Sequence, residues 1–264
     1  MENFKNENQA RQRANVLGIG VDAIDMRTAT ENIFAALDAN RKGYVCVTGV
    51  HGVIESQKSP ELKRIINESL LTTPDGMPTV WVGRLQGHKK MRRVYGPDLM
   101  LEICRRSVGK NLSHFFYGGN VGVAEQLADN LAEMFPGIKI AGTYTPPFRP
   151  LAAHEETSFR ALVRRTKPDI FWVGLSTPKQ EKFMAEYIDK LDTKIMLGVG
   201  AAFDVHTGKM QDSPDWIKRI GMQWFHRLVQ EPNRLGRRYG VIVPTFLYKT
   251  LLQFTGAKKY RIEA

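Results

Sequence analysis

The chain has 264 residues, of which 42% are hydrophobic and 25% are charged, proportions that exclude a disordered or fibrous protein. The 38 Lys and Arg residues outnumber the 27 Asp and Glu residues, which gives a net charge of +11. Ten of the basic but only two of the acidic residues lie between Ile217 and Ala264, so a nearly neutral body ends in a basic tail. Such a tail is typical of proteins that meet an anionic surface, either membrane phospholipid or nucleic acid.

The predicted elements alternate between strands and helices from about residue 15 to residue 200. Strands are predicted at 15–24, 43–48, 114–117, 138–143, 170–173 and 195–199. Helices are predicted at 28–40, 97–108, 121–135, 154–166 and 178–191. This order indicates an α/β fold, a Rossmann-like and mostly parallel sheet with helices on both faces. After Asp212 the pattern changes to a helix at 214–228 and a basic, apolar tail, so we predict a main domain over 1–213 and a C-terminal helical appendage over 214–264.

The cysteines and the two ends of the chain bear on its location. Cys46 and Cys104 both lie in apolar stretches, which fits a reducing compartment and gives no metal-ligand spacing. Residues 1–13 are polar and lack the apolar core of a signal peptide. The apolar run Val241–Phe254 is shorter than the roughly 20 residues that a membrane span needs. We therefore expect a cytoplasmic protein that lies peripherally on the inner face of the membrane.

Two glycine-bearing turns follow predicted strands. After the strand at 114–117 comes the turn from Gly118 to Gly122, and a strand–glycine–helix turn can present backbone N–H groups to a phosphate. The same glycines would also serve simply to allow a tight turn, and both interpretations stay open. The second turn, from Gly198 to Asp204, has only part of a dinucleotide fingerprint, which argues against a nicotinamide enzyme.

Three polar segments are candidates for chemistry. Asp75 lies either in a plain Pro-Asp-Gly turn before a helix near 78–85 or at a loop tip, placed as a general base for a hydroxyl. Arg93 precedes a helix and is either a bidentate phosphate ligand or part of a solvated basic face. Lys179, Gln180 and Glu181 open a further helix at a strand end, which an ordinary helix start would also explain.

Several signatures are missing from the sequence. It has no Asp-x-Asp triplet for a divalent ion on a nucleotide diphosphate and no His/Cys set with zinc spacing. It also has neither a P-loop nor a G-x-S-x-G elbow. We therefore expect no metal and no resident cofactor.

Six segments in order carry a resemblance to a known family: Thr72–Met77, Arg93–Leu99, Tyr117–Glu125, Gly174–Glu181, Gly198–Val205 and Trp224–Arg238. On these segments the chain resembles the WecG/TagA/CpsF family of bacterial glycosyltransferases, glycosyltransferase family 26. The resemblance implies an inverting, metal-independent transfer of a sugar from a UDP-sugar to a polyprenyl-pyrophosphate-linked sugar at the cytoplasmic membrane face. The domain over 1–213 would be catalytic, and the appendage over 214–264 would associate with the membrane and help to complete the active site.

The resemblance also implies roles for individual residues. Asp75 matches the family's proposed general base, and Thr48, Arg93 and Gln180 match its other catalytic positions. Without a metal, arginines and turn amides would neutralise the departing diphosphate. The implied substrate-binding residues are Gly118, Gly119, Lys179, Gly200, Asp204, His51, Arg227, Arg234, Arg237 and Arg238.

Two departures from the family pattern concern the sugar. Many relatives carry Asn where this chain has Val50, followed by His51, and Ala where it has Pro74. These changes resemble the exopolysaccharide branch, so the expected donor sugars are glucose, N-acetylmannosamine or its uronic acid. The expected partners are a UDP-sugar, a polyprenyl-pyrophosphate-linked acceptor and an anionic membrane; a homo-oligomer stays open. The rival hypothesis is a nucleic-acid-binding protein that uses the basic tail, although no DNA- or RNA-reading module is recognisable.

Overall fold

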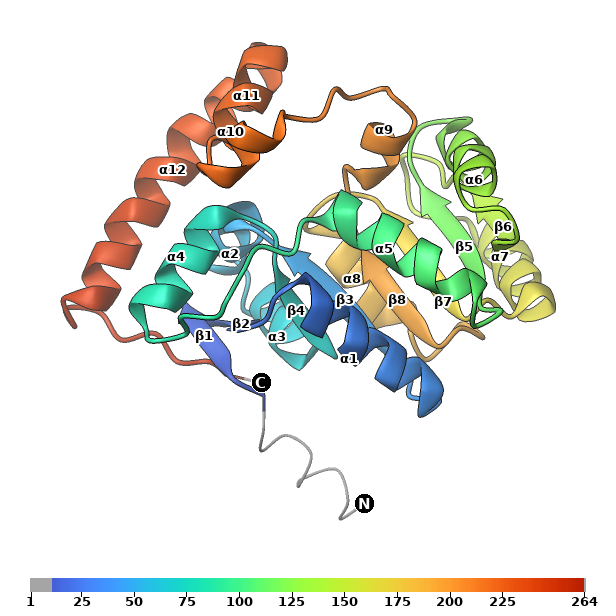
Figure 1. The fold of residues 1–264 in the computed structure, drawn as a ribbon, viewed down its shortest axis with the longest axis horizontal. Coiled ribbons are helices and arrows are strands. Elements are labelled where there is room, and N and C mark those ends of the chain that lie inside the picture. The colour runs from blue at the N-terminus through green and yellow to red at the C-terminus, as the bar shows by residue number, and fades with distance from the viewer. Residues whose placement is uncertain (1–10, 264) are drawn as a thin grey trace.

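The central feature is a six-stranded sheet with the strand order β4-β3-β8-β7-β5-β6, in which every neighbouring pair is parallel (Figure 1). The computed structural model describes residues 11–263, apart from the side chains of Asp215, Arg219 and Arg234. The strands are β3 (Gly43–Thr48), β4 (Leu71–Pro74), β5 (Ser113–Gly118), β6 (Lys139–Tyr144), β7 (Ile170–Gly174) and β8 (Ile195–Gly198). The predicted α/β, Rossmann-like class is confirmed.

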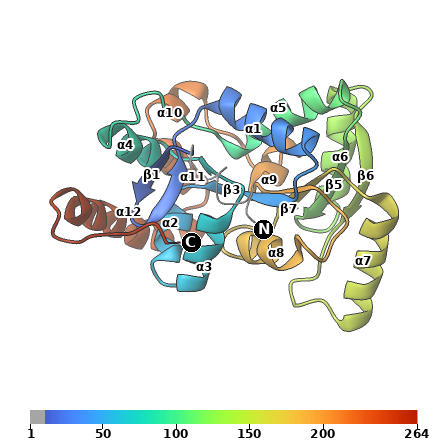
Figure 2. The same ribbon diagram turned by 90° about the horizontal axis from the view of Figure 1, so that it is seen from below.

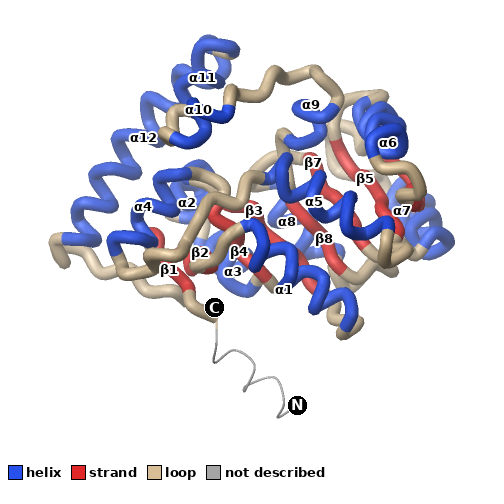
Figure 3. The backbone as a smooth tube through the Cα atoms, viewed as in Figure 1, coloured by secondary structure: helices blue, strands red, loops and turns tan. Residues whose placement is uncertain are grey.

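Helices cover both faces of the sheet, as Figures 2 and 3 show. One face carries α1 (Met26–Asp38), α5 (Gly96–Val108), α6 (Val123–Met134) and α9 (Ala202–His206), and the other α2 (Val50–Ser56), α3 (Pro60–Glu68), α7 (Ala153–Thr166) and α8 (Lys179–Tyr187). Strand β7 shows why the sheet is covered twice. Its Ile170 and Trp172 pack into one hydrophobic cluster and its Phe171 and Val173 into the other. A continuous apolar run is what a strand buried on both faces requires.

The predicted strand at 15–24 is wrong as a single element. The structure has two antiparallel strands here, β1 (Arg13–Val16) and β2 (Ile19–Asp22), which form a separate two-stranded sheet. Leu17 and Gly18 between them have φ angles of 54° and 86°, which a two-residue hairpin of the primed type requires. The unbroken apolar run conceals this turn in the sequence.

The predicted helix at 214–228 is also divided. It forms α10 (Asp215–Arg219) and α11 (Gln223–Gln230), and the break falls at Gly221, where φ is 75°. A side chain on Gly221 would bring Cβ within 2.8 Å of the Trp81 ring on α4 (Met77–Leu85), so only glycine fits this turn.

The basic, apolar tail forms one long helix, α12 (Pro232–Phe254), along the side of the molecule (Figure 1). Its Ile242 and Phe246 are buried in the same hydrophobic cluster as Val16 and Leu17 of the hairpin. None of the described helices has the length and apolar character needed to cross a bilayer.

After α12 the chain returns to the body. Asn15 donates through its side chain to the Tyr260 carbonyl at 2.7 Å, and Asn67 donates likewise to the Glu263 carbonyl at 2.7 Å. The Gln253 side chain accepts from the Leu17 amide at 3.0 Å. The C-terminal part of α12 is therefore fixed to the body, and the domain boundary at 213 stays a prediction.

Candidate active site at the carboxyl ends of the strands

The topology has a switch point at the ends of β3 and β8, which are neighbours in the sheet. Helix α2 follows β3 on one face and α9 follows β8 on the other, so the two connections diverge. Ligands of open α/β sheets bind at such a switch point, outside the carboxyl ends of the strands. Thr48 ends β3, Asp75 follows β4, and Gly200 lies two residues after β8. The structure thus brings these three predicted residues to one edge of the sheet.

Asp75 is anchored by one residue of a strand and one residue of a helix. Its backbone N–H donates to the Thr48 carbonyl at 3.2 Å, and its Oδ1 accepts from the Gly96 N–H at 3.1 Å, at the start of α5. Loss of hydration raises the pKa of the Asp75 carboxyl, although Arg93, the Gly96 amide and Arg227 all favour the ionised form. A carboxylate with a raised pKa is a stronger base. Strand β4, which the sequence did not predict, sets this position.

Arg93 joins the strand-end loops to the C-terminal segment. Its Nε donates to the backbone carbonyl of Asp75, and a terminal nitrogen donates to the Gln223 side chain on α11. The guanidinium lies 4.2 Å from the centre of the Tyr95 ring. Helix α11 therefore covers the loop that carries the predicted base.

Asp212 is the centre of a network that sequence reasoning missed. Its Oδ1 accepts from the Tyr95 hydroxyl at 2.9 Å and from Gln223 Nε2 at 3.2 Å, and its Oδ2 lies 2.6 Å from Lys218 Nζ. Burial alone would raise the pKa of Asp212, but Lys218 and Tyr95 hold it below its ordinary value. No motif in the sequence marks these residues, and the contact of Asp212 with Tyr95 joins segments 117 positions apart.

Arg227 is one of the predicted tail arginines, and its charge affects Asp75. It extends from α11, and its charge lowers the pKa of Asp75. Its Nε is buried without a hydrogen-bond partner, while a terminal nitrogen contacts the Met210 sulfur at 3.4 Å. A buried donor of this kind is costly unless a ligand accepts from it.

The other predicted arginines lie on α12. Arg237 and Arg238 are exposed, and the side chain of Arg234 lies outside the part of the chain that the structure describes. Burial and the nearby Arg238 both lower the pKa of His51, which lies on α2 with Nε2 4.0 Å from a Glu55 carboxylate oxygen. The structure therefore brings His51 to the tail helix.

Backbone conformation and packing alone explain why the turn after β5 contains glycines. Gly118 and Gly119 have φ angles of 124° and 75°, and a Cβ on Gly118 would lie 2.6 Å from the Gly174 carbonyl oxygen. The Gly119 N–H already donates to that oxygen at 3.1 Å. Phosphate binding by this turn stays a prediction.

The remaining predicted residues lie around α8 and α9. Lys179 is exposed in the first turn of α8, and Gln180 beside it is buried. Asp204 lies in α9, where its carbonyl accepts from the Met210 amide at 3.0 Å. Gln180 faces the end of β8, so a Cβ on Gly200 would lie 3.4 Å from its Oε1.

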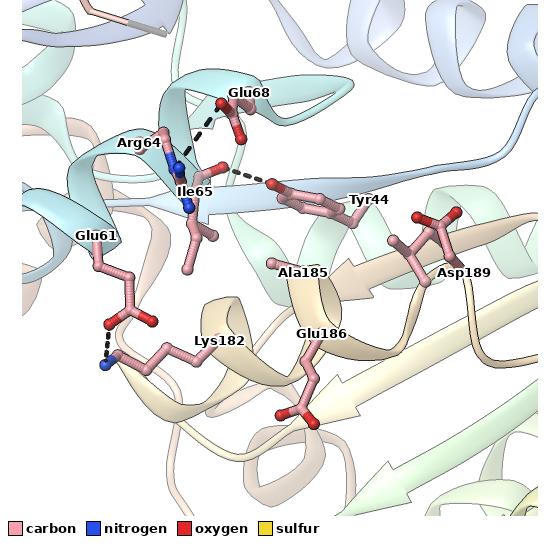
Figure 4. A pocket seen from close by; sticks show the side chains of 10 residues that line it. Tyr44, Glu61, Arg64, Ile65, Glu68, Lys182, Ala185, Glu186 and Asp189 are labelled. Carbon is pink, nitrogen blue, oxygen red and sulfur yellow. Dashed lines mark hydrogen bonds and ion pairs between the residues drawn. The ribbon is translucent and has the colours of Figure 1, made fainter.

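A separate hollow lies between α3 and α8 (Figure 4). Lys182 and Glu61 form an ion pair of 2.6 Å across it, and the Tyr44 hydroxyl donates to the Ile65 carbonyl at 2.7 Å. Tyr44 lies near the start of β3, whereas the predicted site residues follow strand ends, and none of them lines this hollow. Within residues 11–263, no group of three or more His, Cys, Asp and Glu side chains is arranged to hold a metal ion.

Comparisons with known proteins identify relatives of this chain. A relative from Bacillus subtilis is 29% identical over 67% of this chain and 67% of its own, and one from Bacillus spizizenii is 26% identical over 78% of each. A third, from Staphylococcus aureus, is 23% identical over 90% of this chain and 91% of its own. All three are named N-acetylglucosaminyldiphosphoundecaprenol N-acetyl-beta-D-mannosaminyltransferase. The model of the glycosyl transferase WecG/TagA/CpsF family matches residues 14–260, and the chain belongs to this family of glycosyltransferases.

Proposed function

We propose that this enzyme moves a sugar from a UDP-sugar to a sugar linked to polyprenyl diphosphate, with inversion at the anomeric carbon. The observation that carries the proposal is Asp75, a carboxyl group with a raised pKa that is held at the end of β3 and lies near two arginines. The names of the relatives support a lipid-diphosphate-linked acceptor.

The chemistry follows from this arrangement. Asp75 takes the proton of the acceptor hydroxyl as its oxygen attacks the anomeric carbon from the side opposite UDP. The bond to the UDP oxygen breaks, UDP leaves with the electron pair, and the product is β-linked. Arg227, whose buried Nε lacks a partner, and Arg93 support charge neutralisation at the diphosphate by the protein's own cations. We therefore propose a reaction without a resident metal.

The donor sugar is proposed from the relatives. Their shared name specifies N-acetylmannosamine, so the UDP-linked form of this sugar is the first donor to test. Glucose and the uronic acid are the other candidates, because Val50 and Pro74 depart from the usual family pattern. A place in exopolysaccharide rather than other surface-polymer synthesis would follow from use of those donors.

The test is a screen of UDP-sugars against a synthetic polyprenyl-diphosphate monosaccharide, with product mass and anomeric configuration as readouts. We expect a β-linked disaccharide whose formation survives EDTA. Replacing Asp75 by Asn should lower kcat by about 100-fold or more, the range of general-base catalysis, while UDP binding persists. Near wild-type turnover in this variant would overturn the role of Asp75.

We also propose that the enzyme docks on the cytoplasmic face of an anionic membrane through α10 and α11. Helix α11 turns its polar Gln223 and Arg227 toward the protein and leaves Phe225 and Val229 exposed, 48% and 65% respectively. Trp216 on α10 is 64% exposed. A helix whose apolar face points away from its own protein is suited to a hydrophobic partner, and the basic tail supports an anionic lipid surface.

A further inference from the structure

Gln180 and Glu181 form a buried polar pair in the first turn of α8. They are 3% and 1% exposed, although carboxylates and amides are rarely buried so completely. Glu181 Oε1 accepts from Gln180 Nε2 at 3.1 Å and from the Thr177 hydroxyl at 2.8 Å. One carboxylate oxygen thus holds both the amide of Gln180 and the turn that precedes the helix.

The pair leaves two acceptors unused. Gln180 Oε1 and Glu181 Oε2 are both buried and have no hydrogen-bond partner. A buried acceptor without a donor is costly, so a protein retains one where a ligand supplies the donor. Protein interiors seldom contain two such oxygens on adjacent residues for structural reasons alone.

The position of Gln180 indicates which ligand could supply the donor. A Cβ on Gly198 would lie 3.1 Å from Gln180 Nε2, and one on Gly200 would lie 3.4 Å from Oε1. The carboxamide therefore lies over the end of β8, at the same edge of the sheet as Thr48 and Asp75. Because Nε2 is bonded to Glu181, the amide must present its oxygen, not its nitrogen, on the Gly200 side.

We propose that Glu181 is a positioning residue that fixes Gln180 with Oε1 toward Gly200, where this oxygen accepts from a hydroxyl group of the sugar nucleotide. The inference rests on the proposed function and deepens it, because it names the group that Gln180 recognises. The hydroxyl belongs either to the transferred hexose or to the ribose of UDP. Glu181 acts through Gln180 and does not itself touch the reacting atoms.

The alternative is that Glu181 merely stabilises the start of α8 through Thr177. The matched control is therefore Thr177→Val, which removes the second donor to the same Oε1 and leaves the bond to Gln180. Glu181→Leu removes the anchor of the amide, whereas Glu181→Gln retains an oxygen that can accept from Gln180. If Glu181 positions Gln180, Glu181→Leu loses most of the transferase activity, whereas Glu181→Gln and the control Thr177→Val keep most of it.

The experiment measures kcat and KM for the UDP-sugar, and Kd for UDP and for the UDP-sugar by calorimetry, in these variants and in Gln180→Ala. Glu181→Leu should lower kcat/KM by about 100-fold, as expected when a substrate-binding group is misplaced. In the Gln180→Ala background the same substitution should have almost no further effect. Additive losses, or an equal loss in Thr177→Val, would overturn the proposal.

The binding measurements identify the hydroxyl group and distinguish a failure of the Glu181 proposal from a failure of the proposed function. A loss of affinity for the UDP-sugar with unchanged affinity for UDP assigns the hydroxyl to the hexose, and an equal loss for both assigns it to the ribose. Unchanged affinity for both ligands in Glu181→Leu would contradict the proposal. If the wild-type enzyme binds these ligands but transfers no sugar, the proposed function fails while the binding comparison still tests Glu181.

Discussion

At the scale of single residues, the acid–base behaviour of Asp75 is set by opposing effects. Lost hydration raises its pKa, and the positive charges of Arg93 and Arg227 limit the rise. A general base must be ionised, so kcat should increase with pH as Asp75 loses its proton, with a midpoint above the ordinary value of about 4. Arg227→Gln removes a charge that stabilises the carboxylate, so the midpoint should move to higher pH.

The control variants separate charge from hydrogen bonding. Arg227→Lys keeps the charge and loses the Nε donor, so it should lower kcat/KM by about tenfold without moving the pH midpoint. Lys259→Gln removes an exposed charge from the segment after α12 and should leave the profile unchanged. A pH profile of kcat that is identical in wild type and Arg227→Gln would show that Arg227 does not act on Asp75.

At the scale of elements, the attachment of α10 and α11 depends on Asp212, which bonds to Tyr95 on the body and to Lys218 on α10. Asp212→Asn removes the charge that holds Lys218, so we expect faster hydrogen exchange across residues 215–230 and a loss in kcat/KM of about tenfold or more. Asp38→Asn is the matched control, because it breaks an exposed pair of 2.7 Å with Lys110. Equal exchange rates in the two variants would refute the role of Asp212.

The sheet itself contains a pH-sensitive chain of hydrogen bonds. Trp172 Nε1 donates to His114 Nδ1 at 3.0 Å, so in the neutral ring Nε2 carries the hydrogen. His114 Nε2 donates to the Ser107 hydroxyl oxygen at 2.6 Å, and the Ser107 hydroxyl donates to the Cys104 carbonyl at 2.7 Å. Burial lowers the pKa of His114 to about 4. The folded protein favours the neutral ring of His114. The free energy of unfolding is therefore unaffected by this group above pH 6.5, its pKa in the unfolded chain, and declines as the pH falls toward 4.

The expected loss of unfolding free energy from His114 is about 3 kcal/mol across that window. Urea unfolding at neutral pH and at about pH 4.5 measures it. His114→Phe should be less stable at neutral pH because two polar partners lose their bonds, but its stability should fall less between the two pH values. An equal fall in both proteins would assign the acid sensitivity to other groups.

At the scale of the whole molecule, the sequence predicts what local patterns encode. Strands β3 and β7 were predicted within a residue because each is a short apolar run that follows a charged residue, Lys42 or Asp169. Strand β4 was missed because Leu71–Pro74 is short and ends in a proline, which argues against a strand. The family resemblance pointed to Thr48, Asp75, Arg93 and Gln180, whereas the contact of Asp212 with Tyr95 joins segments 117 positions apart and appears only in the fold.

The membrane proposal concerns the molecule as a whole, and the structure decides how to test it. Deleting residues 234–264 would remove Ile242 and Phe246 from the core, so loss of binding in that truncation would report unfolding. Surface substitutions avoid this problem. The variant with Trp216, Phe225 and Val229 all replaced by Ser removes exposed apolar area and leaves the core intact.

We expect this triple variant to lose most of its flotation with anionic vesicles, because inserted apolar side chains add to the attraction of about 1 kcal/mol per basic residue near the surface. The control replaces Val121 and Phe148, each 88% exposed in loops that follow β5 and β6, by Ser. It should float like the wild type. Turnover of a short, water-soluble acceptor should be equal in all three proteins, because the exposed face of α11 lies opposite Arg227, whose charge acts on Asp75. Equal flotation of the two variants would show that docking does not use α10 and α11. Binding of the wild type to an oligonucleotide, without binding to vesicles, would assign the basic tail to nucleic acid instead.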